Sequence, residues 1–182
     1  MRIATFNVEH LGLPHGDGPS LEARIDALRP MLERLCADVL CLQEVDADRT
    51  PGNKNRRLVA LDALLAGTAY AEFHRHASGD ATGHPLADVH NIVTLSRYPI
   101  NARSELRHAL VPPLSYQAVT SQPASDKAAS VEFDRPVLVT ELRLPDGHAL
   151  HVVNVHLRAP IASPIAGQKE SSFVWRSAAG WA

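Results

Sequence analysis

The chain has 182 residues, of which 45% are hydrophobic and 21% charged, and its formal net charge is -2. These values are typical of one soluble globular domain and exclude a global positive field for gripping nucleic acid, although a local basic cleft stays possible. The opening sequence MRIATFNVEH reaches polar residues too early for a signal peptide, and no apolar run approaches the ~18 residues of a membrane span. We therefore expect a cytoplasmic protein without a membrane span.

The first part of the chain predicts a β-α-β unit. Alternating side chains favour a strand over Ile3–Val8, and the glycine- and proline-rich sequence LGLPHGDGP follows as a loop. Ser20 is placed to cap a helix. Apolar residues recur through that helix at helical spacing, at Leu21, Ile25, Leu28, Leu32 and Leu35. Asp38 then opens a short strand over Val39–Leu42, whose apolar run is unbroken.

The middle of the chain has a weaker pattern. A second helix is predicted over Arg56–Leu65 and ends before a glycine, the usual stop residue. Tyr70–His74 is a possible strand, and Asn91–Leu95 is another short one. The stretch from Arg103 to Ser130, with its prolines and small polar residues, predicts a long surface loop.

The last part predicts two strands, Val137–Leu144 and His148–Leu157, joined by PDGH, whose Asp-Gly pair favours a hairpin turn. The closing sequence SSFVWRSAAGWA predicts the start of an aromatic helix over residues 173–181. This helix has no C-cap and no charged last turn, so we expect the chain to stop partway through a larger fold.

Polar side chains follow or interrupt three of the predicted strands. Asn7 lies near the end of the first and Glu44 at the end of the second, while Asn154 and His156 share one face of a late strand. Singly, each is ordinary for a strand end, but open α/β folds build their sites at strand ends. A carboxylate with a neutral Asn suits Mg²⁺, and a His with an Asn can stabilise charge on a phosphate.

Zinc is disfavoured by the same sequence. There is no HExxH motif and no quartet of cysteine and histidine. His74 and His76 could hold a metal, but two histidines two residues apart are more often simply exposed on one strand face.

Five motifs, in order, resemble the endonuclease/exonuclease/phosphatase superfamily. They are RIATFNVEHLG, ADVLCLQEVD, NIVTLSRYPI, RPVLVTELRLPDG and HVVNVHLRAP, and they extend from Arg2 to about Pro160. The resemblance implies an α/β fold, the N-terminal part of a four-layer α/β/β/α sandwich with two face-to-face sheets. It also implies hydrolysis of phosphate esters with Mg²⁺ or Mn²⁺. The implied partner is a phosphate-ester substrate, with nucleic acid among the candidates.

The resemblance also assigns roles to residues. Glu44 matches the family's metal-ligand glutamate, and Asn7 matches the asparagine beside the metal. His156 matches the histidine that contacts the scissile phosphate, and Asn154 takes the partner place in the N-x-H motif. Arg135, in DRPVLV, resembles an arginine that several members place near the phosphate.

The family's later motifs are missing. Neither Gly-Asp-x-Asn nor the terminal Ser-Asp-His occurs in these 182 residues, so the resemblance lacks the family's general base. We therefore expect residues 1–182 to be a single incomplete domain, inactive by itself. The alternative is a non-catalytic interaction module on a degenerate version of the fold. The loops that would select the substrate, LPHGDGP and Arg103–Ser130, do not indicate DNA, RNA, a phosphoinositide or another ester.

Overall fold

The computed structural model describes residues 1–14, 18–157, 165–171 and 174–177. These residues form two compact units. Unit 1 consists of Met1–Arg107 and Asp134–His156, and unit 2 consists of His108–Phe133 and the described residues from Leu157 onward. Every candidate site residue of the sequence lies in unit 1, which has the α/β fold that the family resemblance predicts.

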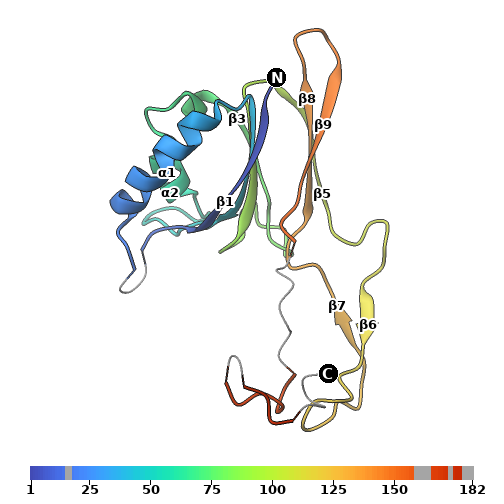
Figure 1. Ribbon diagram of the computed structural model, residues 1–182. Coiled ribbons are helices and arrows are strands. Elements are labelled where there is room, and N and C mark those ends of the chain that lie inside the picture. The colour runs from blue at the N-terminus through green and yellow to red at the C-terminus, as the bar shows by residue number, and fades with distance from the viewer. Residues whose placement is uncertain (15–17, 158–164, 172–173, 178–182) are drawn as a thin grey trace. The chain divides into compact units, whose positions relative to one another are not determined.

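Unit 1 contains a mixed four-stranded sheet in the order β1-β2-β4-β3. Its strands are β1 (Ile3–Leu11), β2 (Val39–Val45), β3 (His74–Ala77) and β4 (Asn91–Ser96). β1 and β2 are parallel because the helix α1 (Leu21–Leu35) connects them, whereas β4 runs antiparallel to both β2 and β3. Helix α1 and the short helix α2 (Val59–Leu65) cover one face of this sheet (Figure 1).

A second sheet lies on the opposite face (Figure 1). It has the order β5-β8-β9 and comprises β5 (Ile100–Leu106), β8 (Val137–Arg143) and β9 (Ala149–Asn154). The two sheets and the helices are three of the four layers expected for the family. A helical layer outside the second sheet is not found among the described residues.

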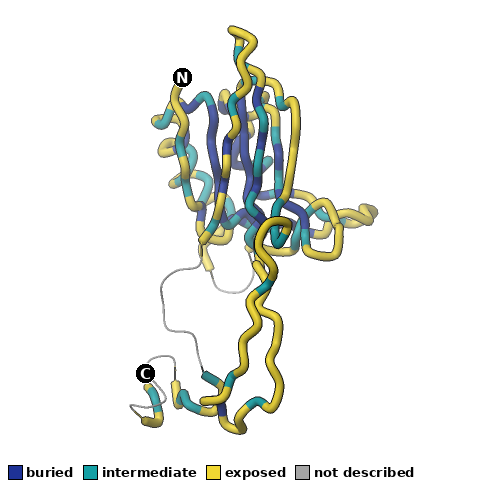
Figure 2. The backbone as a smooth tube through the Cα atoms, turned by 90° about the vertical axis from the view of Figure 1, so that its right-hand side faces the viewer, coloured by how far each residue is buried: buried dark blue, intermediate teal, exposed yellow. Residues whose placement is uncertain are grey.

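The core explains why β2 is apolar without interruption. Leu40 and Leu42 pack in the large cluster beneath α1 and α2, while Val39 and Cys41 pack against the second sheet. Burial on both faces removes the alternation of a half-exposed strand. The buried residues accordingly run through the centre of both sheets (Figure 2).

Several sequence predictions are confirmed. Ser20 caps α1, since its Oγ accepts a hydrogen bond from the Ala23 N–H at 3.2 Å. The predicted apolar face of that helix packs on the core. β8 and β9 form the expected antiparallel hairpin, with Gly147 at φ 86° in the PDGH turn.

Other predictions are wrong. Residues 69–72 form a 3₁₀ helix, η1 (Ala69–Glu72), because the Thr68 side chain accepts a hydrogen bond from the Tyr70 N–H and caps the turn. α2 begins at Val59, because Arg57 pairs through its backbone with Asp48. β3 exposes His74 but buries His76, so the two histidines do not share an exposed face.

The stretch predicted as a surface loop, Arg103–Ser130, contains one whole strand and parts of two others. β5 extends to Leu106, and unit 2 contains a two-stranded antiparallel sheet made of β6 (Leu114–Tyr116) and β7 (Ala129–Val131). The predicted aromatic helix is not seen at residues 174–177, where Trp175 instead forms an isolated β-bridge with Lys169. The remainder of that prediction lies outside the described residues. Within the described chain, no helix has the length and apolar character needed to cross a membrane.

Candidate functional site

Irregular pairing shapes the ends of β1 and β2. Between Asn7 and Leu11, the register of β1 shifts against β2. Between Leu42 and Val45, the register of β2 shifts against β4. Such bulges break the alternation of a strand and re-aim its side chains. Several residues of the candidate site lie inside or beside these two bulges.

The backbone is left-handed at four non-glycine residues of this region. The φ angles are 49° at Glu9, 51° at His10, 62° at Glu44 and 60° at His90. L-residues rarely adopt this conformation, and residues held in it cluster at functional sites. The left-handed turn at Glu44 lets its side chain leave the buried strand and face Asn7.

Asn7, Glu44 and His156 meet at one edge of the sheets. The Asn7 Nδ2 donates to Glu44 Oε1 at 2.9 Å, and His156 Nε2 lies 3.3 Å from the same oxygen. Asn7 Nδ2 also lies 3.5 Å from His156 Nε2. The Glu44 and His156 side chains are only 18% and 16% exposed. Three residues that the sequence places at three separate strand ends therefore form one half-buried cluster.

The Glu44 carboxylate is held in its charged form. The hydrogen bond from Asn7 lowers the pKa of Glu44 against the effect of partial burial, and His10 and His156 lower it further. An ionised carboxylate at a solvent-accessible edge is the donor that a hard divalent cation requires. Glu44 thus fits the predicted metal-ligand role.

Asn7 has a different orientation from a metal ligand. Its Oδ1 accepts a hydrogen bond from the Glu9 N–H at 2.8 Å, while its Nδ2 faces Glu44. Asn7 therefore orients the carboxylate in this arrangement, and its direct coordination of a metal stays a prediction.

The pKa of His156 lies below its ordinary value. Burial lowers the pKa of His156, and the nearby charge of Arg135 lowers it further. Nε2 faces Glu44, while Nδ1 is buried and has no hydrogen-bond partner within the described part of the chain. The ring is thus fixed with one nitrogen toward the cluster.

Asn154 lies deeper than the cluster and bridges the two sheets. Its Oδ1 accepts a hydrogen bond from Gln43 Nε2 at 2.9 Å, and its Nδ2 donates to the Val93 carbonyl at 3.1 Å. The residue is buried, with 2% of its surface exposed. Asn154 therefore ties the end of β9 to β2 and β4, and this positions His156 two residues later.

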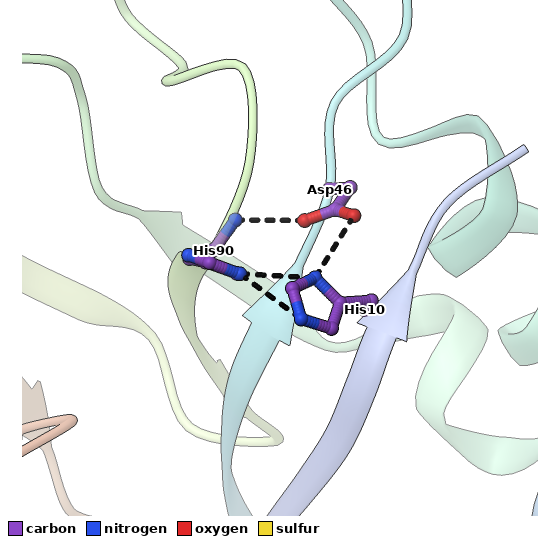
Figure 3. A group of neighbouring side chains, drawn as sticks. All are labelled: His10, Asp46 and His90. Carbon is purple, nitrogen blue, oxygen red and sulfur yellow. Dashed lines mark hydrogen bonds and ion pairs between the residues drawn. The ribbon is translucent and has the colours of Figure 1, made fainter. Parts of the chain in front are cut away.

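A second cluster consists of His10, Asp46 and His90 (Figure 3). His10 lies near the end of β1, Asp46 directly follows β2, and His90 directly precedes β4. His90 Nε2 lies 2.9 Å from His10 Nδ1, and Asp46 Oδ2 lies 3.8 Å from His10 Nδ1. His10 Nε2 lies 3.6 Å from Glu44 Oε2, which joins this cluster to the first.

Arg135, which lies two residues before β8, contacts the second cluster through His90. Its Nη2 lies 2.7 Å from His90 Nδ1. Its Nε is buried and has no hydrogen-bond partner among the residues described. Burial lowers the pKa of His90, and Arg135 and His10 lower it further, against the opposite effect of Asp46 and Glu44.

Sequence reasoning missed the second cluster. His10 and Asp46 each stand two or three residues beyond a predicted site residue, in NVEH and QEVD, and this proximity is the only local signal. His90 carries none, since it is remote in sequence and its position depends on the pairing of β4 with β2.

Comparison with known proteins identifies the fold family. The Endonuclease/Exonuclease/phosphatase family matches residues 4–172. Among solved structures, an endonuclease/exonuclease/phosphatase family protein from Leptotrichia buccalis C-1013-b is 20% identical with a TM-score of 0.53. That match covers 88% of this chain and 56% of the other. At this identity the likeness concerns the fold.

Two further structures are similar over much of the chain. Truncated TDP2 from Caenorhabditis elegans is 18% identical with a TM-score of 0.49, and the match covers 86% of this chain and 46% of that one. An endonuclease/exonuclease/phosphatase from Beutenbergia cavernae DSM 12333 is 19% identical with a TM-score of 0.48, covering 87% and 38%. The chain thus spans less than two thirds of each of these structures. A search of curated protein sequences gives no significant match. The family match extends over most of the chain and includes both clusters, and the chain belongs to the endonuclease/exonuclease/phosphatase family.

Proposed function

We propose that this protein takes part in divalent-metal-dependent hydrolysis of phosphate esters, of the nuclease, phosphodiesterase or phosphatase type. Members of its family are typically hydrolases. The observation that carries the proposal is the convergence of Asn7, Glu44 and His156 within 3.5 Å of one another. A structural role alone does not require a charged carboxylate in a left-handed turn beside two histidines.

In this proposal, Glu44 is the metal carboxylate. Mg²⁺ or Mn²⁺ bound there would supply positive charge beside the phosphate and polarise it. Asn7 holds the carboxylate in place through the 2.9 Å hydrogen bond and keeps it ionised. A fixed, charged oxygen donor needs no rearrangement when a cation arrives.

His156 and Arg135 would act on the phosphate. His156 presents Nε2 to the same oxygen of Glu44, so a phosphate held beside that carboxylate also lies within reach of the imidazole. Arg135 supplies a guanidinium, which can form paired hydrogen bonds with a phosphate. Asn154 acts through position, because its hydrogen bonds to Gln43 and Val93 fix the segment that carries His156.

Hydrolysis would need more acid–base chemistry than these residues provide. Glu44 is the one carboxylate among the site residues of this proposal, and it is already assigned to the metal. None of these residues therefore remains to activate water. The family's Gly-Asp-x-Asn and Ser-Asp-His motifs do not occur in the sequence. We therefore propose that the 182-residue chain has little or no turnover by itself. The cytoplasmic location and the substrate class also stay proposals.

The test is hydrolysis of bis(p-nitrophenyl) phosphate with Mg²⁺ or Mn²⁺. It is made on the 182-residue chain and, where the gene encodes more residues, on the complete product. Glu44→Gln should remove most of the metal-dependent rate, because it replaces the charged ligand with a neutral one of the same shape. Glu33→Gln, a change at an exposed position on α1, is the matched control and should keep the full rate.

Two outcomes would contradict the proposal. Full activity in Glu44→Gln would make Glu44 an ordinary strand-end residue. A complete gene product that hydrolyses no phosphate ester with any divalent cation would favour the non-catalytic interaction module instead.

A further inference from the structure

We propose that His10, Asp46 and His90 form a second cation site, suited to a transition-metal ion such as Zn²⁺, and that its occupation releases Arg135 from His90. The site is separate from the predicted metal carboxylate, Glu44. No sequence motif indicates it, since its three ligands come from three separate segments: the end of β1, the residue after β2 and the residue before β4.

The three candidate ligand atoms are already close together. One nitrogen of His10, one nitrogen of His90 and one oxygen of Asp46 all lie within 4.8 Å of one another. Two ligands of a tetrahedral Zn²⁺ ion, each ~2.1 Å from it, are about 3.4 Å apart. The distance of 2.9 Å between the two imidazole nitrogens and that of 3.8 Å from His10 to Asp46 lie on either side of this value. Small shifts of the side chains would therefore suffice.

Neighbouring groups orient two of the three ligands. The backbone N–H of His90 donates to Asp46 Oδ1 at 2.7 Å, which leaves Oδ2 directed at His10 (Figure 3). When His10 coordinates through Nδ1, its Nε2 carries the proton and faces Glu44 Oε2 at 3.6 Å. A carboxylate behind a metal-bound histidine is the usual arrangement in zinc sites. The His10 side chain is 57% exposed, so a cation can reach the site from solvent.

His90 is the ligand whose ring proton must move when a cation binds. A guanidinium only donates hydrogen bonds, so the 2.7 Å contact from Arg135 requires His90 Nδ1 to be the unprotonated acceptor. A neutral imidazole carries one N–H, and in this state it must be on Nε2, where it donates to His10. Coordination of a cation by His90 Nε2 moves that proton to Nδ1, directly against Arg135.

The cation and the contact between Arg135 and His90 therefore exclude each other. Without the cation, Arg135, His90 and His10 form a chain of hydrogen bonds. With it, Arg135 faces a donor instead of an acceptor and must turn away. In the proposed phosphoesterase, the guanidinium is then available to a substrate phosphate; this last step rests on the proposed function, whereas the exclusion does not.

Binding measurements test the exclusion through variants with opposite effects. The untagged chain is titrated with Co²⁺, which reports its coordination through visible absorption, and Zn²⁺ is then added as competitor. We expect one equivalent to bind. His90→Ala should weaken binding by more than the ~10- to 100-fold that the loss of an outer-sphere partner costs. Arg135→Met should tighten it about tenfold, because no charge-assisted hydrogen bond has to be broken.

The matched control is His148→Ala, at an exposed histidine in the turn between β8 and β9, which should leave the affinity unchanged. A measurement on the unsubstituted protein removes dependence on the folding of any variant. Long-range ¹⁵N–¹H NMR spectra of the histidine rings should show His90 protonated on Nε2 without metal and on Nδ1 with Zn²⁺.

Three results would contradict parts of this proposal. Binding no stronger than that of His90→Ala would overturn the site. Equal affinity in Arg135→Met and the unsubstituted protein, or a His90 proton that stays on Nε2 when Zn²⁺ is bound, would overturn the exclusion of Arg135. None of these readouts depends on hydrolysis, so they can fail while Glu44-dependent activity persists.

Discussion

Acidification from pH 7 to pH 5 should destabilise unit 1 through one buried histidine, His76. This residue lies between the two sheets with 5% of its surface exposed, and its Nδ1 pairs with Thr140 Oγ1 at 2.8 Å. Burial lowers the pKa of His76 to about 4, with a smaller contribution from Arg103. The folded protein therefore holds this imidazole neutral across the range in which an unfolded chain protonates it.

The sign follows from the two pKa values. Between pH 6.5 and pH 4, the unfolded chain binds a proton at His76 that the folded chain does not, so the free energy of unfolding falls as the pH falls. The full shift corresponds to about 3 kcal/mol, of which about 2 kcal/mol is lost by pH 5. This is a large part of the ~5–15 kcal/mol by which a typical domain is stable.

Urea denaturation at pH 7 and pH 5, followed by circular dichroism at 222 nm, measures the effect. Among the described residues, the α-helices belong to unit 1 and Trp175 belongs to unit 2, so circular dichroism reports the unfolding of unit 1 more directly than tryptophan fluorescence. His76→Gln should lose about 2 kcal/mol less than the unsubstituted chain over this interval. His148→Gln is the control, since that histidine is exposed. An equal loss in His76→Gln and the unsubstituted chain would refute the reasoning.

Three further predictions concern the site. Asn7→Ala should raise the pKa of Glu44 in the metal-free protein, because it removes the main hydrogen bond to the carboxylate; an unchanged carboxyl titration in ¹³C NMR would argue against that role. In the proposed enzyme, His156→Ala should lower kcat by ~100-fold with little change in KM, since a donor to developing charge acts in the transition state. A matching loss of thermal stability would instead mark a structural histidine. Asn154→Ala should lower the free energy of unfolding by about 1–3 kcal/mol, because it removes the buried hydrogen bonds that join Asn154 to Gln43 Nε2 and to the Val93 carbonyl. A urea midpoint unchanged at constant m-value would contradict this.

The sequence predicts the core elements of unit 1 because their patterns come from burial. β2 is apolar throughout since both its faces are covered, and α1 shows both its cap and its apolar face in the local sequence. The strands that were missed have no such pattern. β5 is an edge strand of its sheet with mostly exposed side chains, and β6 and β7 are three residues long and exposed. Pairing with a neighbour, rather than side-chain burial, defines these strands.

The candidate site was predictable to a similar extent. Strand ends indicate that Asn7 and Glu44 come together, because β1 and β2 are parallel neighbours in one sheet. His156 follows β9 of the second sheet, so its place beside them depends on how the two sheets pack. The distinction between ligand and positioning residue was not predictable, since it depends on which way the amide of Asn7 points. The second cluster requires the bulges in β1 and β2, whose left-handed residues have no glycine to announce them.

Those left-handed residues imply a trade-off between the stability of the fold and the side chains of the candidate site. For an L-residue this conformation costs roughly 1–2 kcal/mol, and glycine adopts it freely. Selection for thermal resistance alone would therefore tend to place glycine at positions 10, 44 and 90. Each such exchange would relax the backbone and delete an imidazole or a carboxylate from the site. In the proposed enzyme, Glu44→Gly should abolish the hydrolysis of phosphate esters, yet the protein should melt no lower than its parent, which would make it useful for crystallising bound substrates.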